Sequence, residues 1–113
     1  MRRYFISEYF KKQAKPYFKK YRHLLDDVIQ ALKTFEKRSV ISLGANTYKI
    51  RIKASDIPKG KSHAFRLIIL LIEREDELFI PLVLYFKGDR ASITKAEILY
   101  HSQCIQREIE AIQ

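Results

Sequence analysis

The sequence predicts a small α+β domain, and three patterns lead to this prediction. Helical periodicity is confined to the two ends of the chain. Between them, residues 64–72 and 78–86 are strongly β-prone, and the charged segment 73–77 joins them as a hairpin turn would. Residues 47–53 alternate between apolar and basic side chains, which is the two-residue period of a strand. Short connections between these strands favour an antiparallel meander over a parallel α/β fold or a sandwich.

The N-terminal part is expected to form a short strand followed by helices. Residues 3–6 are the candidate strand, and a polar helical turn should follow over 8–14. Pro16 indicates a break or a new helix start, because proline lacks the backbone N–H of a helix interior. From 18 to 37 apolar residues recur at helical spacing, so this helix should pack on the sheet. Its apolar stripe contains Leu24, Val28, Leu32 and Phe35.

Local signals also mark the second half of the chain. Residues 42–46 are predicted to be a turn, because Gly44 and Asn46 tolerate positive φ. Pro81 lies inside a predicted strand and cannot donate to a ladder, which indicates a bulge or a sheet edge. Residues 94–97 have the capping-box pattern and should open a C-terminal helix. The expected order is β-α-(α)-β-β-β-α in one domain, 1–113, with an antiparallel sheet packed against the N-terminal helices.

Charge and composition limit the partners and the compartment. The formal net charge is +9, which favours nucleic acid, an anionic membrane or an acidic protein as a partner. The single cysteine, Cys104, excludes an internal disulfide and suggests a reducing, cytoplasmic setting. No signal-peptide pattern opens the chain, and the longest apolar run, 67–72, is far shorter than the roughly 20 residues that span a bilayer. We therefore expect no membrane-spanning segment, and we do not count a membrane among the partners.

One face of the predicted strand 47–53 is basic. Lys49, Arg51 and Lys53 alternate with apolar residues, so the three cations should point to the same side. Like charges repel each other and serve no purpose in the fold, so this row suggests a surface for a polyanion. If 47–53 pairs with 64–72, Arg66 should lie beside the row at the surface, with the loop 54–63 above it. The remaining basic residues expected around it are Lys59, Lys61, His63 and Lys87.

The residue types restrict the chemistry of this surface. The sequence has no paired Cys or His motif with metal-ligand spacing and no glycine-rich phosphate loop, so we expect neither a metal nor a small-molecule cofactor. Metal-free RNA cleavage needs a base, stabilisation of the phosphorane charge and an acid. Arginine suits phosphate binding, and histidine or a lysine crowded by other cations suits proton transfer.

Four segments, in this order along the chain, resemble the RelE/ParE toxins of bacterial type II toxin–antitoxin systems, in particular the HigB-like branch. They are 18–24 (FKKYRHL), 43–51 (LGANTYKIR), 60–66 (GKSHAFR) and 84–98, which joins LYFKGDR to ITKAEI. The resemblance implies a small α+β toxin neutralised by a cognate antitoxin. RelE-like members cleave mRNA in the ribosomal A site without a metal, whereas ParE-like members poison DNA gyrase.

The resemblance also implies roles for individual residues. The cations of the second family strand match Lys49 and Arg51, the arginine of the third matches Arg66, and a basic residue after the last strand matches Lys87. These four are the candidate catalytic residues, and we expect Arg66→Ala to abolish toxicity while leaving folding intact. The candidate RNA-binding residues are Lys53, Lys59, Lys61, His63 and Arg90. Gly88 and Thr94 stand where RelE itself has an arginine and a tyrosine, and Arg90 and Tyr100 are the nearest replacements.

Three hypotheses follow from these observations. The leading one is a ribosome-dependent mRNA endonuclease, with the antitoxin, mRNA and the ribosome as partners. The second is a non-enzymatic binding toxin of the same fold, either a gyrase poison or a basic RNA-binding module. The third is a degenerate toxin that binds its antitoxin but does not arrest growth.

Overall fold

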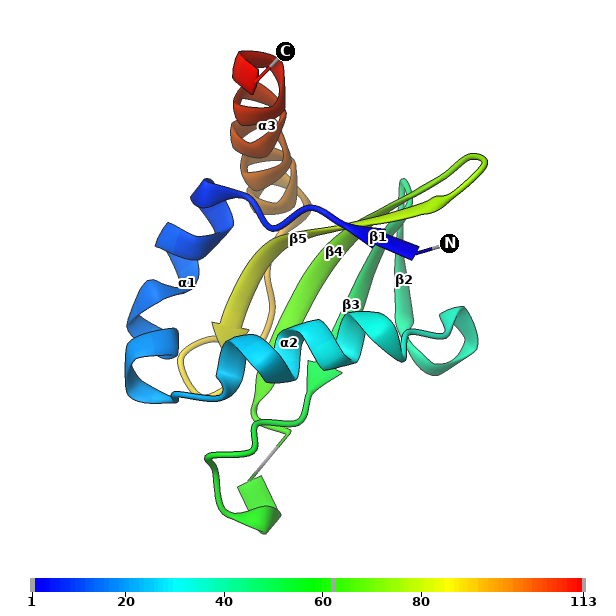
Figure 1. Ribbon diagram of the computed structural model, residues 1–113. Helices are drawn as coiled ribbons and strands as arrows, with labels where there is room; N and C mark the ends of the chain where they lie inside the picture. Colours follow the sequence, from blue (N-terminus) through cyan, green and yellow to red (C-terminus); the bar gives the residue numbers. More distant parts are fainter. Residues whose placement is uncertain (1, 62, 113) are drawn as a thin grey trace.

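A mixed five-stranded sheet organises the described part of this computed structural model, residues 2–61 and 63–112 (Figure 1). The strands are β1 (Arg2–Tyr4), β2 (Ile41–Gly44), β3 (Thr47–Ile52), β4 (Phe65–Glu73) and β5 (Glu77–Phe86), and they lie in the order β1-β5-β4-β3-β2. The helices are α1 (Glu8–Lys20), α2 (Leu24–Lys33) and α3 (Lys95–Ile112), with single 3-10 turns at Lys37–Ser39 and Lys59–Lys61. The predicted α+β class is confirmed.

The prediction of an antiparallel sheet is wrong at one edge. β2 to β5 pair in antiparallel fashion, but β1 runs parallel to β5, with Arg3 beside Leu78. A hairpin forces neighbouring strands to reverse direction, whereas the chain leaves β1 through two helices, so no turn fixes its direction. The Arg2 guanidinium ties this edge to the end of α2. It donates to the carbonyl oxygens of Leu32 (3.1 Å), Lys33 (2.9 Å) and Phe35 (2.7 Å).

The helix boundaries differ from the predicted ones because tertiary contacts override local signals. Pro16 lies inside α1, on its exposed side, and the helix continues to Lys20. Phe10 and Ala14 are fully buried, and this packing maintains the helix despite the missing proline N–H. The break falls instead before α2, where both the backbone N–H and the Nδ1 atom of His23 lie 2.8 Å from the carboxylate of Asp56.

The turn predicted over 42–46 is shorter than expected and follows a strand. Gly44, Ala45 and Asn46 have φ angles of +85°, +51° and +61°, so the prediction of positive φ at Gly44 and Asn46 is confirmed. Residues before the turn form β2, which pairs with β3 at Ile41 and Ser42. β2 has only four residues and is largely exposed, so the alternation of Ile41 and Leu43 with Ser42 and Gly44 is too short to reveal a strand.

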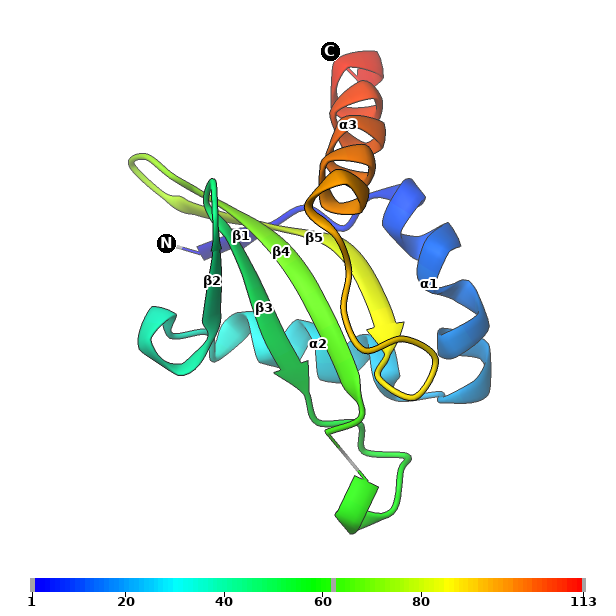
Figure 2. The same ribbon diagram turned by 180° about the vertical axis from the view of Figure 1, so that it is seen from behind.

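Two cores cover the two faces of the sheet. α2 lies across one face, and α3 lies on the other face, as the two opposite views show (Figures 1 and 2). The first core joins α1 and α2 to alternate residues of β3, β4 and β5, and the second joins α3 to the opposite face of β4 and β5. The predicted bulge at Pro81 is confirmed, because the β4–β5 register shifts where Pro81 pairs with Ile69.

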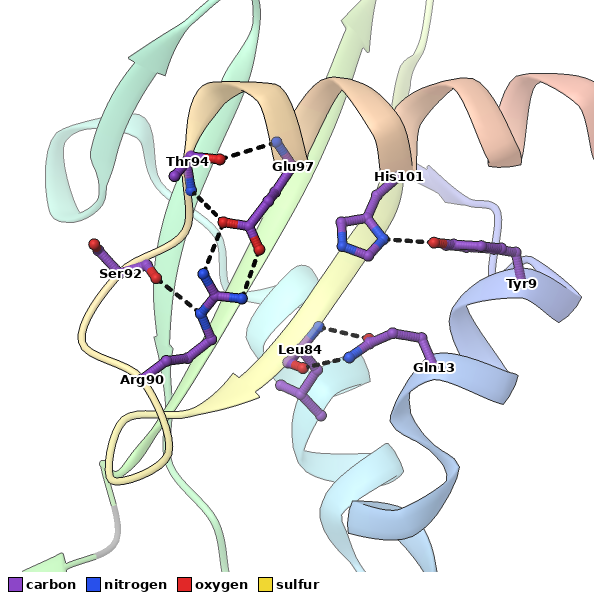
Figure 3. Close-up of polar contacts among 8 residues, drawn as sticks. All are labelled: Tyr9, Gln13, Leu84, Arg90, Ser92, Thr94, Glu97 and His101. Atoms are coloured by element: carbon purple, nitrogen blue, oxygen red, sulfur yellow. Dashed lines mark hydrogen bonds and ion pairs between the residues drawn. The ribbon is translucent and has the colours of Figure 1, made fainter.

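Helix α1 covers the part of the β5 edge that β1 leaves free. β1 pairs with residues 77–79 of β5, so the backbone groups further along this edge have no neighbouring strand to bond to. The Gln13 side chain amide donates to the carbonyl oxygen of Leu84 (2.8 Å) and accepts from its N–H (2.9 Å) (Figure 3). The Tyr17 hydroxyl accepts from the N–H of Phe86 (3.4 Å). Two side chains thus replace a neighbouring strand.

The predicted capping box at the start of α3 is confirmed (Figure 3). The Thr94 hydroxyl accepts from the Glu97 N–H (3.1 Å), and the Glu97 carboxylate accepts from the Thr94 N–H (3.0 Å). That carboxylate also accepts two hydrogen bonds from the Arg90 guanidinium, at 2.6 and 2.7 Å. The Arg90 bonds, with the Thr94 N–H, lower the pKa of Glu97 from 4.5 to about 2.

This pKa predicts an acid-sensitive contribution to stability. Because the folded-state pKa lies below the ordinary value, the ionised carboxylate stabilises the fold above pH 4.5, and this contribution disappears as the pH falls towards 2. Urea unfolding at several pH values between 5 and 2 should therefore show a smaller acid-induced loss of stability in Glu97→Gln than in the wild type. Glu75→Gln, which changes an exposed carboxylate of the β4–β5 turn, should follow the wild type. Parallel curves for all three proteins would contradict the prediction.

Candidate functional site

Two arginines face each other on neighbouring strands of the sheet. The antiparallel register of β3 and β4 places Arg51 directly opposite Arg66, and the next strand places Tyr85 opposite Arg66. Directly opposed residues project from the same face, so the two guanidinium groups belong to one side of the sheet. The predicted pairing of these strands, with Arg66 beside the basic row, is confirmed.

Arg66 is not a surface residue, and this corrects the prediction that it can be removed without affecting the fold. Its side chain is almost enclosed, since the residue is 9% exposed. Its Nη1 atom donates to the backbone carbonyl oxygens of His63 and Phe65, the second at 3.1 Å. Arg66 therefore stabilises the turn that leads into β4, while Arg51 on the neighbouring strand is exposed.

Two clefts share a basic wall. The smaller, of about 370 Å³, is lined by Arg51, Arg66 and Lys87 together with Lys61 and His63. The larger, of about 680 Å³, contains Arg51, Arg66 and Lys87 again and adds Lys49. Lys87 reaches this position because its backbone N–H donates to the Ala64 carbonyl oxygen (2.7 Å) at the start of β4. We call Arg51, Arg66 and Lys87 the basic wall.

The remaining predicted residues lie elsewhere. Lys53 is exposed beyond the end of β3 and lines neither cleft. The side chain of Lys59 lies outside the described part of the structure. Arg90 also lines neither cleft, and its guanidinium is engaged by Glu97 and by the Ser92 carbonyl oxygen (2.9 Å) (Figure 3). Tyr100 is 60% exposed on α3 and is likewise absent from both linings.

Two charged residues of the larger cleft were missed by sequence reasoning. Glu36 and Arg38 line it from the segment between α2 and β2, and they form an ion pair with 3.1 Å between Nε and Oε2. Glu36 is thus a carboxylate in the same cleft as the basic wall. Predicting β2 would have placed both residues near the cleft, because β2 pairs with β3 and directly follows this segment. That strand was not predicted.

A buried phenol lies behind the basic wall. Tyr85 is 3% exposed, and within residues 2–61 and 63–112 its hydroxyl has no hydrogen-bond partner. Burial raises the pKa of Tyr85, and this outweighs the opposite effect of the nearby Arg66 and Arg90. The phenol is therefore neutral at physiological pH, and it lies directly opposite Arg66 on the neighbouring strand.

A cluster of aromatic rings fixes the start of β4 under the clefts. Phe65 is fully buried and packs edge-on against Tyr17, Tyr21 and Phe86, with ring centroids 5.0, 5.6 and 5.3 Å apart. These rings come from α1, the break before α2, and the end of β5. The residue next to Phe65 is Arg66, so the cluster also fixes the position of the basic wall.

We expect Arg66→Ala to reduce stability as well as any activity of the cleft. The substitution leaves the carbonyl oxygens of His63 and Phe65 without their charged donor, which should cost about 1–3 kcal/mol of unfolding free energy. Urea unfolding should show a lower midpoint with an unchanged slope. Arg51→Ala, on the exposed arginine opposite, is the matched control and should unfold like the wild type. An Arg66→Ala protein as stable as the wild type would show that these hydrogen bonds contribute nothing.

The described residues contain neither a candidate metal site nor a membrane-spanning helix. Among the described residues, no three His, Cys, Asp or Glu side chains are grouped so that they could hold a metal ion. None of the described helices is long and apolar enough to cross a bilayer. Comparison of the chain with protein-family models, curated proteins and solved structures found no match to any of them.

Proposed function

We propose that this protein is a toxin of a type II toxin–antitoxin system that cleaves mRNA without a metal. The observation that supports this proposal most directly is the convergence of Arg51, Arg66 and Lys87 on one cleft that also contains Lys61 and His63. These cations come from different strands and from the loop before β4, so the fold gathers them at one point. A pocket with this composition fits a phosphodiester and the charge that develops on it during cleavage.

Each cation has a role that its chemistry allows. The exposed Arg51 contacts the scissile phosphate, because a guanidinium can bind two phosphate oxygens at once. Arg66, held rigidly behind it, stabilises the negative charge of the phosphorane. The 2′-hydroxyl attacks phosphorus and loses its proton, while the leaving 5′-oxygen gains one. Lys61, His63 and Lys87 line the same cleft and are the candidates for these two proton transfers.

The order of the elements supports the proposal in outline, although the meander has four strands, β2 to β5, where three were expected. A strand and two helices precede a meander that ends in a C-terminal helix, and the N-terminal helices pack on one face of the sheet. By this proposal, the protein acts in the cytoplasm on mRNA bound to the ribosome. An antitoxin with an acidic or amphipathic surface covers the basic wall and neutralises the protein.

Translation in a cell-free system tests the proposal. Purified protein should stop synthesis of a reporter, and primer extension should map new 5′ ends within codons of the translated message. The same message without ribosomes should remain intact. Normal translation with intact message at high protein concentration would overturn the proposal. Addition of the product of the neighbouring reading frame should restore synthesis if that product is the antitoxin.

A second function is a non-enzymatic toxin, either a gyrase poison or a basic RNA-binding module. The observation that favours it is the position of Arg90 and Tyr100, the nearest replacements for the arginine and tyrosine of RelE, outside the cleft linings. A protein that lacks both groups at the site keeps its phosphate contacts but has fewer sources of the acid for cleavage. Inhibition of gyrase supercoiling without mRNA cleavage would select this alternative.

A further inference from the structure

A second basic surface lies on α1, apart from the clefts. From Tyr9 to Leu25 the sequence has no Asp or Glu, although it has six Lys and Arg residues. All six are exposed, and four of them lie close together on α1: Lys12, Lys15 and Lys19 are on the helix side opposite the buried Phe10 and Ala14, and Lys11 lies beside them. We call these four residues the α1 lysine face: Lys11, Lys12, Lys15 and Lys19.

The spacing of these lysines destabilises α1, and the fold does not require it. Residues four apart on a helix have Cβ atoms about 5–6 Å apart, and like charges at this spacing destabilise the helix. Lys11, Lys15 and Lys19 follow this spacing, and only Lys11 has an acidic neighbour, Glu8, at 3.3 Å. Among the described residues, Lys12, Lys15 and Lys19 take part in no ion pair. An exposed helix normally mixes charges of both signs, so this face indicates a ligand that carries regularly spaced negative charge.

The side chains beside the α1 lysine face indicate which class of polyanion it can bind. The exposed large apolar side chains among the described residues are Ile41, Leu99, Tyr100 and Ile112, and none lies on α1. A helix that binds a membrane surface needs an exposed apolar side, which α1 lacks. Single-stranded nucleic acid is usually held by exposed aromatic rings, and the rings of α1 point inward. Contacts from cations alone suit the phosphate backbone of a duplex.

The α1 lysine face is also connected to the cleft. The Tyr17 hydroxyl, on the same helix, donates to Asp89 Oδ2 (3.2 Å) and accepts from the Phe86 N–H. These two residues flank Lys87 of the basic wall. The C-terminal end of α1 and the end of β5 lie side by side in both views (Figures 1 and 2). A polyanion on α1 can thus extend towards the rim of the cleft.

We propose that the α1 lysine face binds the backbone of double-stranded RNA, independently of its sequence, while the cleft receives a single strand. This inference rests on the proposed function for the identity of the nucleic acid. The duplex contact positions the protein on a folded RNA, and the cleft acts on the strand that lies beside it. Binding of this kind releases counterions, so it weakens steeply as salt increases.

The test compares two variants with the same loss of charge. The first changes Lys11, Lys12, Lys15 and Lys19 to glutamine, and the second changes four exposed cations of other elements to glutamine. The control positions are Lys33, Arg74, Lys95 and Arg107. Binding of a labelled, fully paired RNA duplex is measured by fluorescence anisotropy at several salt concentrations. Circular dichroism establishes that both variants are folded.

The α1 variant should bind the duplex about 10- to 100-fold more weakly, and the slope of log affinity against log salt should fall by about 3. The control variant should lose less than about 3-fold. Equal losses in both variants, or no duplex binding by the wild type, would overturn the inference. Stronger binding to vesicles containing phosphatidylserine than to the duplex, lost in the α1 variant, would also overturn it in favour of a membrane.

A third protein separates this inference from the proposed function. Arg51→Ala changes the cleft and should still bind the duplex like the wild type, within about 3-fold. If the wild type does not cleave mRNA but binds the duplex through α1, the proposed function fails and the inference stands. If the wild type cleaves mRNA and the α1 variant binds the duplex as tightly as the wild type, the inference alone fails.

Discussion

Replacing Arg51 with alanine is expected to reduce mRNA cleavage by about 100- to 1,000-fold, the usual cost of losing one charge-stabilising donor in an active site. Arg51 is exposed, lines both clefts and lies opposite Arg66 on the next strand. Since its side chain is exposed, the unfolding free energy should change by less than about 0.5 kcal/mol. The measurement is the rate of message cleavage in cell-free translation, with urea unfolding of the same preparation.

Two further variants make this prediction specific to the guanidinium of Arg51. Arg51→Lys keeps the charge but cannot bind two phosphate oxygens in one plane, so it should restore only part of the activity. Arg74→Ala removes an exposed arginine of the β4–β5 turn and should cleave like the wild type. Wild-type cleavage by Arg51→Ala would remove Arg51 from the active site and leave the role of the whole cleft in doubt.

Replacing Phe65 with alanine is expected to lower the unfolding free energy by about 3–5 kcal/mol, the usual cost of deleting a buried phenylalanine ring. The ring is fully buried, and three other aromatic rings pack edge-on against it. This loss is a large fraction of the roughly 5–15 kcal/mol that stabilises a typical domain. Urea unfolding at constant pH measures it directly, with the slope compared between variants.

Leu99 provides the control for the size of the deleted side chain. It is 58% exposed on α3, so Leu99→Ala should change stability by less than about 0.5 kcal/mol. A cost below about 1 kcal/mol for Phe65→Ala would mean that the cavity collapses around Tyr17, Tyr21 and Phe86. In that event the aromatic cluster would not be what fixes the start of β4 beneath the clefts.

The sequence predicted the parts of the site that depend on strand alternation. Alternating residues in 47–53 placed Lys49 and Arg51 on one face, and strand pairing then placed Arg66 beside them. The burial of Arg66 could not be predicted in this way, because it depends on the backbone turn at His63 that encloses the guanidinium. Periodicity indicates the face from which a side chain projects, but not what covers it.

The fold shows the same division between local and long-range information. The turn at 44–46, the bulge at Pro81 and the capping box at Thr94 are each specified by a few adjacent residues, and all three are confirmed. The parallel pairing of β1 depends on residues more than 70 positions away. The ion pair of Arg90 depends on how the loop folds back on α3, and that path is not visible in composition.

The contacts of α1 with β5 have a consequence for the order in which the chain folds during synthesis. Gln13 and Leu84 are 71 residues apart, and β1 pairs with residues that follow it at a similar separation. Pairing at such separations delays folding, because a long loop must close before the contact forms. While the chain is being translated, the edge of the sheet stays open until β5 has left the ribosomal tunnel. The basic wall, to which β5 leads directly, is therefore assembled only when most of the protein has been made.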